Sequence, residues 1–134
     1  MPVTLAPEKQ EEMLSAARAA FKKAHAPYSN FKVGSTILTE RGALYSGCNV
    51  ENASYGLTIC AERNAVFAAV AAEGSSMRIT AVAVATEREG PCAPCGACRQ
   101  VIYEFGPEAL VLFRGQTGTE QMAITKLLPE GFHL

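Results

Sequence analysis

Hydrophobic and polar positions at the start of the chain follow the period of a helix. Apolar residues recur three or four positions apart over residues 7–24, which predicts an amphipathic helix. These apolar positions are Met13, Ala17, Phe21 and Ala24. Pro7 and the glutamates after it suit a first helical turn, because acidic side chains favour the positive end of the helix dipole. The Pro-Tyr-Ser-Asn run at 27–30 predicts the end of this helix.

The pattern then changes to that of strands. The runs Phe31–Thr39 and Leu44–Asn49 are rich in β-forming residues, and they flank a Glu-Arg-Gly turn at 40–42. Two such runs around a short glycine-containing turn predict a β-hairpin. Residues 51–57 are polar, and we expect them to form a loop.

A second helix is predicted over residues 58–73. We expect Thr58 to be its N-cap and Gly74 to occupy the C′ position after its end. Every residue from Ala65 to Ala72 is apolar, so this helix should be buried on most of its sides.

Shorter apolar runs fill the rest of the chain. Ile79–Ala85 and Ala109–Phe113 have the composition of strands that are covered on both faces. A third helix is expected at 94–105, where a Gly-Pro pair then ends it. Residues 119–122 predict a last strand, and residues 123–128 predict a short final helix.

The order of these elements is a helix, a hairpin, and then helix and strand twice. Strands joined by helical crossovers pair in parallel, and the helices then cover both faces of the sheet. We therefore predict an α/β fold, a three-layer α/β/α sandwich around a mixed sheet of five strands. The chain has no internal repeat or linker-like segment, so residues 1–134 are expected to form one domain.

The charge balance weighs against polymeric and membrane partners. Twelve basic and 13 acidic residues leave a net charge of −1, which gives no electrostatic reason to bind nucleic acid or an anionic membrane. No segment approaches the roughly 18 uninterrupted apolar residues of a membrane span. Residues 1–10 lack the layout of a signal peptide, so we expect a cytoplasmic protein.

Three of the five cysteines fall at the starts of predicted helices. Cys60 opens the second helix, whereas Cys95 and Cys98 open the third and lie one helical turn apart. Helix N-termini favour the thiolate, which is the form that binds metal. If the two helix starts meet, three sulfurs make a zinc site with a fourth position open for water, the catalytic pattern. Glu62 lies close enough to Cys60 to reach that water.

These residues also match the signature of zinc-dependent base deaminases, a ligand-x-Glu motif followed by Pro-Cys-x-x-Cys. The chain has Cys-Ala-Glu at 60–62 and Pro-Cys-Gly-Ala-Cys at 94–98. His25 and His133 lie near a helix end and the C-terminus, and we interpret both as surface or interface residues rather than ligands.

Other uses of the cysteines remain open from the residues alone. Cys48, in a predicted strand, is interpreted as a small buried apolar residue. A structural Cys₄ zinc site would recruit Cys92 or Cys48, but it leaves Glu62 without a role. An iron–sulfur run starting at Cys92 needs a fourth cysteine at position 102, where the chain has Ile102. A thioredoxin-like Cys-x-x-Cys pair is a further alternative.

Beyond these motifs, the chain resembles the small, homotetrameric cytidine deaminases over nearly its whole length. Asn49–Tyr55 is the most specific stretch, because it separates nucleoside deaminases from relatives that share only the zinc motifs. The extra Cys92 and the short tail at 131–134 depart from the family pattern. The matching segments are APYS at 26–29, FKVG at 31–34, GCNVENASY at 47–55, CAER at 60–63, PCGACRQ at 94–100 and LLP at 127–129.

The resemblance implies that Cys60, Cys95 and Cys98 hold one Zn²⁺ per subunit. It implies that Glu62 shuttles protons while cytidine and 2′-deoxycytidine are hydrolysed to uridine or deoxyuridine and ammonia, a reaction of pyrimidine salvage. Arg63 would bond to the zinc thiolates and offset their charge. The plain alternative for Arg63 is a surface charge.

The resemblance also implies a set of substrate contacts. Phe31 would pack on the pyrimidine, while Asn49 and Glu51 would hold the ribose 3′-hydroxyl, with Ala61 and Tyr55 completing the site. These residue types fit, since an aromatic face stacks on a flat base and polar side chains pair with a hydroxyl. From the residues alone, core packing of Phe31 and a solvated loop for the two polar residues remain alternatives.

Finally, the resemblance implies a homotetramer with active sites at subunit contacts. The apolar segment Ala65–Ala72 agrees with this, because it exceeds what one face of a small sheet needs. We expect Tyr55 and Phe132 to lie near a neighbouring subunit's pocket.

Two rival functions use the same cysteines differently. One is a deaminase of a cytosine-bearing nucleoside antibiotic such as blasticidin S, which shares the zinc motifs. The other is a non-catalytic module with a closed Cys₄ zinc site.

Overall fold

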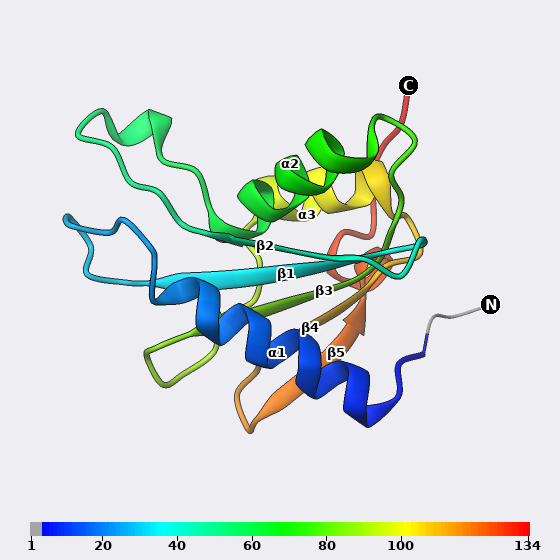
Figure 1. Cartoon of the computed structure of the whole chain (residues 1–134), viewed down its shortest axis with the longest axis horizontal. Helices are drawn as coiled ribbons and strands as arrows, with labels where there is room; N and C mark the ends of the chain where they lie inside the picture. Colours follow the sequence, from blue (N-terminus) through cyan, green and yellow to red (C-terminus); the bar gives the residue numbers. More distant parts are fainter. Residues whose placement is uncertain (1–3) are drawn as a thin grey trace.

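The computed structural model describes residues 4–134, which fold into a five-stranded sheet flanked by helices (Figure 1). None of the helices in this range has the length and apolar character needed to cross a membrane. The helices are α1 (Pro7–Phe21), η1 (Tyr55–Leu57, a 3₁₀ turn), α2 (Ala61–Glu73), α3 (Gly96–Phe105) and α4 (Ile124–Leu127). The strands are β1 (Val33–Thr39), β2 (Leu44–Cys48), β3 (Ile79–Thr86), β4 (Leu110–Arg114) and β5 (Thr119–Ala123).

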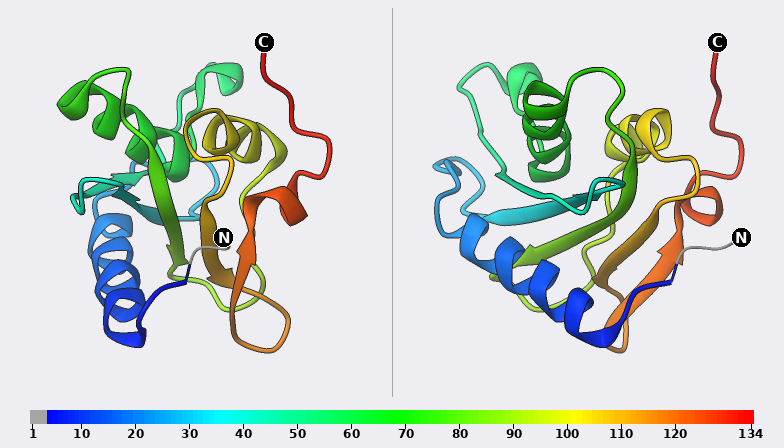
Figure 2. Two further views of the ribbon diagram at one scale, coloured as in Figure 1. Left: turned by 90° about the vertical axis from the view of Figure 1, so that its right-hand side faces the viewer. Right: turned by 45° about the vertical axis from the view of Figure 1, so that its right-hand side comes forward.

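The strands form one mixed sheet in the order β2-β1-β3-β4-β5. β3 and β4 pair in parallel, because the crossover through α3 returns the chain to the same end of the sheet. The other neighbouring strands pair antiparallel, beginning with the predicted β1–β2 hairpin. α1 covers one face, and α2 and α3 cover the other (Figure 2). The predicted three-layer α/β/α sandwich with a mixed five-stranded sheet is confirmed.

Side chains of the central strands alternate between two cores. Ile37 and Val82 point to the side of α2 and α3, and Leu38 and Ala83 point to the side of α1. All seven residues of β1 are buried, because helices cover both faces of this strand. Because side chains alternate along a strand, this pattern fixes which residues face α1 and which face α2 and α3.

α1 ends earlier than its apolar spacing predicts. Met13 and Ala17 are fully buried, as expected, and Phe21 is the last helical residue. Ala24 was predicted to extend the apolar stripe, but it lies after the helix. Its N–H donates a hydrogen bond of 3.1 Å to the Phe21 carbonyl and so closes a turn. This early end leaves residues 22–32 free to run as a loop to one end of the sheet.

A close approach between β2 and α2 fixes the position of the helix that carries Cys60. A Cβ placed on Gly47 would lie 2.5 Å from the Ala65 amide nitrogen and 2.8 Å from the Ala61 carbonyl oxygen. Only a glycine lets the α2 backbone lie this near the strand. The buried Ala61 and Ala65 continue the same tight packing, so the start of α2 is held directly over the end of β2.

Two expectations about α2 are wrong. The helix begins at Ala61 with Cys60 as its N-cap residue, not with Thr58. Ile59 is instead paired with Val50 through two hydrogen bonds of 3.0 Å, and this bridge keeps the chain extended beyond Thr58.

The second error concerns burial of the apolar run in α2. Ala65, Val66 and Ala69 are fully buried, but Phe67 is 48% exposed. Ala68, Ala71 and Ala72 are exposed as well. The helix therefore buries one face against the sheet and presents the other as an apolar surface.

Candidate metal centre and substrate pocket

The three predicted zinc-binding cysteines meet at the starts of two neighbouring helices. Cys60 is the N-cap residue of α2, Cys95 is the N-cap residue of α3, and Cys98 lies in the first turn of α3. Their sulfur atoms all lie within 4.8 Å of one another, with 3.9 Å between Cys60 Sγ and Cys95 Sγ. Because each helix directs its positive end at the cluster, the fold favours thiolates there.

The spacing of these sulfurs fits a zinc ion. Tetrahedral coordination with Zn–S bonds near 2.3 Å puts neighbouring sulfurs about 3.8 Å apart. Zinc accepts thiolate ligands, and three protein ligands leave one coordination position for water or substrate. Cys48 and Cys92 are not members of the ligand group, so the geometry favours a Cys₃ centre over the closed Cys₄ site.

Arg63 supplies positive charge beside the sulfurs. Its Nη2 donates a hydrogen bond to Cys60 Sγ at 3.5 Å. A hydrogen bond from the Cys98 thiol, together with the Arg63 guanidinium, lowers the pKa of Cys60 to about 5. The hydrogen bond with Cys60, followed by burial, raises the pKa of Cys98. One thiolate is therefore already favoured before a metal binds, and the predicted contact of Arg63 with a ligand sulfur is present.

Glu62 lies in the first turn of α2 and is only 5% exposed. Burial, followed by the charge of Cys60, raises the pKa of its carboxyl group to about 7. A carboxyl group with a pKa near neutrality both accepts and releases a proton readily. The structure thus places one such group beside the sulfur cluster.

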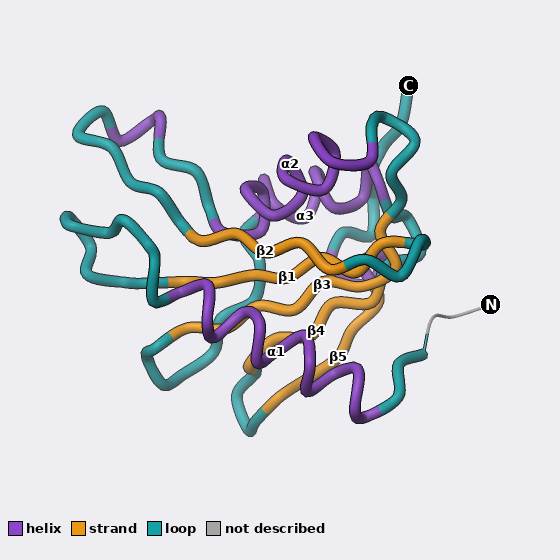
Figure 3. Tube along the Cα trace, in the orientation of Figure 1, coloured by secondary structure: helices purple, strands orange, loops and turns teal. Residues whose placement is uncertain are grey.

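A pocket of about 220 Å³ opens next to the cysteines. Its lining residues come mostly from the segment before β1, the segment after β2, the start of α2 and the β3–α3 connection. The loops among these segments lie at one end of the sheet (Figure 3). Its walls contain most of the predicted site residues together with others. The lining residues are Ser29, Phe31, Val33, Asn49, Glu51, Thr58, Cys60, Ala61, Glu62, Cys92, Ala93 and Cys95.

Tyr55 was predicted to contact substrate, but it does not line this pocket. It is 76% exposed and borders an adjacent groove of about 380 Å³, which shares Ser29, Glu51 and Thr58 with the first pocket. Tyr55 also packs edge-on against Tyr28, with ring centroids 5.8 Å apart. Any contact of Tyr55 with a ligand in the first pocket therefore requires the ligand to extend into the groove, or a second chain to bring its own Tyr55 near.

Asn49 braces the wall of the pocket. Its Oδ1 accepts a hydrogen bond from the Val33 amide at 2.9 Å, and its Nδ2 donates one to the Phe31 carbonyl at 2.7 Å. The side chain is 9% exposed, and it retains one lone pair and one N–H for a ligand. Asn49 thus holds the backbone between Phe31 and Val33, a role that the sequence motif did not reveal.

We expect Asn49→Ala to lower the free energy of unfolding by about 2 kcal/mol, because it removes two hydrogen bonds and leaves buried backbone groups unpaired. Urea denaturation of the ligand-free protein measures this loss. Asn52→Ala, at an exposed position in the same loop, serves as the control and should cost less than about 1 kcal/mol. Equal stability of both variants would contradict the bracing role.

Glu51 is held by the loop that precedes β1. Its Oε1 accepts hydrogen bonds from the amides of Tyr28 at 2.9 Å and Ser29 at 3.2 Å, and its Oε2 accepts one from Ser29 Oγ. The Ser29 hydroxyl and these amides lower the pKa of the carboxyl group. Glu51 is therefore an ionised acceptor at the junction of the two pockets.

Several residues of the site escaped the sequence-based prediction. Ser29 and Thr58 line both pockets, and Cys92 forms part of the wall near Glu62 and Cys60. Burial raises the pKa of Cys92 to about 11, so its thiol is neutral. The matched segment at 26–29 was a usable signal for Ser29, whereas Cys92 was considered only as a metal ligand and as a departure from the family pattern.

Comparisons with known proteins agree with this geometry. Residues 7–114 match the family described as the cytidine and deoxycytidylate deaminase zinc-binding region. The cytidine deaminase of Sporosarcina psychrophila is 44% identical over 124 residues, which cover 91% of this chain and 90% of that protein. A crystal structure of cytidine deaminase from Burkholderia pseudomallei superposes with a TM-score of 0.82 at 49% identity, covering 91% of this chain and 98% of that one. The cytidine deaminase structure from Mycobacterium tuberculosis has the same TM-score at 38% identity, covering 92% and 97%.

The structure combines a Cys₃ centre at two helix starts with a buried glutamate, on the mixed sheet of an α/β/α fold. This is the arrangement of zinc-dependent hydrolytic deaminases. The chain belongs to the cytidine and deoxycytidylate deaminase family, because the family match spans most of its length and close relatives cover about nine-tenths of it.

Proposed function

We propose that the protein hydrolyses cytidine and 2′-deoxycytidine to uridine or deoxyuridine and ammonia. The observation that carries this proposal is the cluster of the Cys60, Cys95 and Cys98 sulfurs beside the 220 Å³ pocket, whose lining includes Glu62. The named activities of the relatives support it.

The three cysteines would hold one Zn²⁺, which as a Lewis acid lowers the pKa of water to about 7 and makes it a nucleophile. Glu62 accepts a proton from that water and delivers it to N3 of the pyrimidine, which makes C4 more electrophilic. The water oxygen adds to C4 as a hydroxyl group. Glu62 then takes the proton of that hydroxyl and passes it to the exocyclic nitrogen, so that the C4–N4 bond breaks and a C4 carbonyl remains. One water is consumed and one ammonia leaves. Burial of Glu62 raises its pKa to about 7, which suits both proton transfers.

The opposite side of the pocket would recognise the nucleoside. Phe31 presents an aromatic ring for the base, while Asn49 and Glu51 present polar atoms for the ribose 3′-hydroxyl. Ala61, fully buried at the first turn of α2, leaves room for the pyrimidine near the sulfurs. This polar sugar side supports a nucleoside rather than a base alone.

Purified protein and an ultraviolet assay of substrate loss test the proposal. We expect turnover of cytidine and 2′-deoxycytidine and none of blasticidin S. Turnover of blasticidin S alone would establish the antibiotic-deaminase alternative. Zinc binding without turnover of any of the three compounds would support a non-catalytic zinc module instead.

The proposal also covers the domain, its cellular location and its pathway. Residues 1–134 would form one catalytic domain that acts in the cytoplasm on free nucleosides in pyrimidine salvage. The net charge of −1 supports a small substrate over a nucleic acid polymer, because a polyanion would require a basic surface.

We further propose a homotetramer with active sites at its subunit contacts. The apolar outer face of α2 supports this, since Phe67 is 48% exposed among exposed alanines. Tyr55 and Phe132 are 76% and 65% exposed, and Leu57 is 64% exposed. Closed symmetry would bury these same side chains on every chain and bring Tyr55 and Phe132 near a neighbouring pocket.

We expect light scattering to give the mass of four 14.2 kDa chains. Phe67→Asp should dissociate the assembly, because it places a charge in the centre of the apolar face. Gln116→Asp adds the same charge at an exposed position in the β4–β5 connection and should leave the mass unchanged. A fully active species with the mass of one chain would rule out the shared site.

A further inference from the structure

One arginine of the β3–α3 connection, Arg88, contacts two residues of the segment before β1. Arg88 Nη2 donates a hydrogen bond to the Ser29 carbonyl at 2.9 Å. The guanidinium carbon of the same side chain lies 4.7 Å from the centroid of the Phe31 ring. Two contacts of one side chain therefore tie the β3–α3 connection to the segment before β1, which forms the facing wall.

The two residues that Arg88 contacts belong to one network. Ser29 Oγ accepts a hydrogen bond from the Phe31 amide at 3.0 Å and donates one to the Glu51 carboxylate. The Ser29 and Tyr28 amides also donate to Glu51. Since Ser29, Phe31 and Glu51 all line the pocket, the position of Arg88 bears on both its aromatic and its carboxylate side.

These contacts are what hold the Arg88 side chain in place. In the described part of the chain, ion pairs join Lys9 to Glu12, Arg18 to Glu11 and Arg41 to Glu73, and none includes Arg88.

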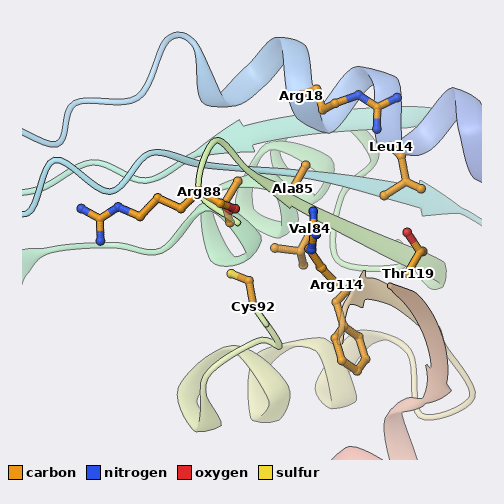
Figure 4. A pocket seen from close by; sticks show the side chains of 10 residues that line it. Leu14, Arg18, Val84, Ala85, Arg88, Cys92, Arg114 and Thr119 are labelled. Atoms are coloured by element: carbon orange, nitrogen blue, oxygen red, sulfur yellow. The ribbon is translucent and has the colours of Figure 1, made fainter. Parts of the chain in front are cut away.

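Figure 4 shows where the side chain runs instead. Arg88 borders a second pocket of about 160 Å³, and its guanidinium extends away from Arg18 and Arg114, which line the same pocket. Cys92 lies between this second pocket and the substrate pocket. Because no ion pair within residues 4–134 holds Arg88, its position over Phe31 reflects two attractions. These are the cation–π contact with the aromatic face and the hydrogen bond to the Ser29 carbonyl.

We propose that Arg88 is a positioning residue for nucleoside binding. It fixes the Phe31 ring by covering one face, so that the base stacks on the other, and through Ser29 it holds the Glu51 carboxylate toward the sugar. The inference rests on the proposed function for its substrate, but the tie between the two walls exists without any ligand. Arg88 touches no reacting atom, so it governs substrate affinity and not the chemical step.

Steady-state kinetics with cytidine test this role. We expect Arg88→Ala to raise KM about tenfold while kcat stays within about twofold of the wild type, because a stacked guanidinium and a charged hydrogen bond are lost. Arg114→Ala is the matched control, since this exposed arginine borders only the second pocket, and its backbone carbonyl still accepts the Cys92 amide. Equal KM values for Arg88→Ala and wild type would overturn the proposal.

A double-mutant cycle with Phe31→Leu shows whether Arg88 acts through the ring. In that background we expect Arg88→Ala to raise KM by less than half the factor that it causes in the wild type. Fully multiplicative effects would contradict action through Phe31.

Hydrogen–deuterium exchange of the ligand-free protein separates this inference from the proposed function. Backbone amides at 28–33 should exchange faster in Arg88→Ala than in wild type or Arg114→Ala, because the tie to the facing wall is lost. A wild type that fails to deaminate cytidine would refute the proposed function, and the exchange rates alone would then decide on Arg88. Unchanged exchange at 28–33 would refute the positioning role.

Discussion

Glu62→Gln should keep the fold and the zinc content while losing nearly all deamination. The amide has almost the same shape as the carboxyl group, but it cannot accept a proton from water. General acid–base catalysis contributes about 10²–10⁴-fold, and we expect kcat to fall by at least this much, since the same group serves several proton transfers. Glu62 is 5% exposed, so no solvent base replaces it easily.

Glu73→Gln is the matched control for this prediction. Glu73 also lies on α2 with a side chain that is 5% exposed, but it sits at the far end of the helix, where it accepts a hydrogen bond from Thr39 Oγ1 at 2.8 Å. A glutamine oxygen accepts the same bond, so kcat should stay near the wild-type value. Near-normal activity of Glu62→Gln, measured by loss of cytidine absorbance, would remove Glu62 from the proton transfers.

The metal centre could be predicted from the sequence because it depends on local spacing. Cys95 and Cys98 lie one helical turn apart, and Cys60 precedes an apolar run, so each helix start could be placed to within two residues without tertiary information. Whether the two helix starts meet remained a condition of the prediction, because the predicted order put helices on both faces of the sheet without assigning each helix to one. The separation of 3.9 Å between Cys60 Sγ and Cys95 Sγ shows that they do meet.

Features that depend on contacts between distant segments could not be predicted in this way. Thr58 had the chemistry of an N-cap, but the bridge between Ile59 and Val50 overrides that local preference. The apolar run in α2 indicated burial, but the pattern could not say which of its side chains face the sheet, and Phe67 is 48% exposed. Arg88 had no motif at all, because its contacts join segments 59 residues apart.

Replacing single cysteines should divide the five into two groups. We expect Cys60→Ala, Cys95→Ala and Cys98→Ala each to lose zinc and activity, because only these sulfurs form the ligand cluster. Loss of a residue that merely supports a ligand weakens metal binding by roughly 10–100-fold, and loss of a ligand itself should cost more. Atomic emission of the purified variants gives zinc per chain, and circular dichroism checks that each remains folded.

Cys92→Ala and Cys48→Ala supply the comparison within the same chain. Cys92 lines the pocket with a neutral thiol whose pKa is about 11, and Cys48 ends β2 outside the ligand cluster. Both variants should retain one zinc per chain. Loss of zinc from Cys92→Ala would mean that a fourth sulfur fills the position needed by water. In that case the centre would be a closed structural site, and Glu62, however deeply buried, would have no water from which to take a proton.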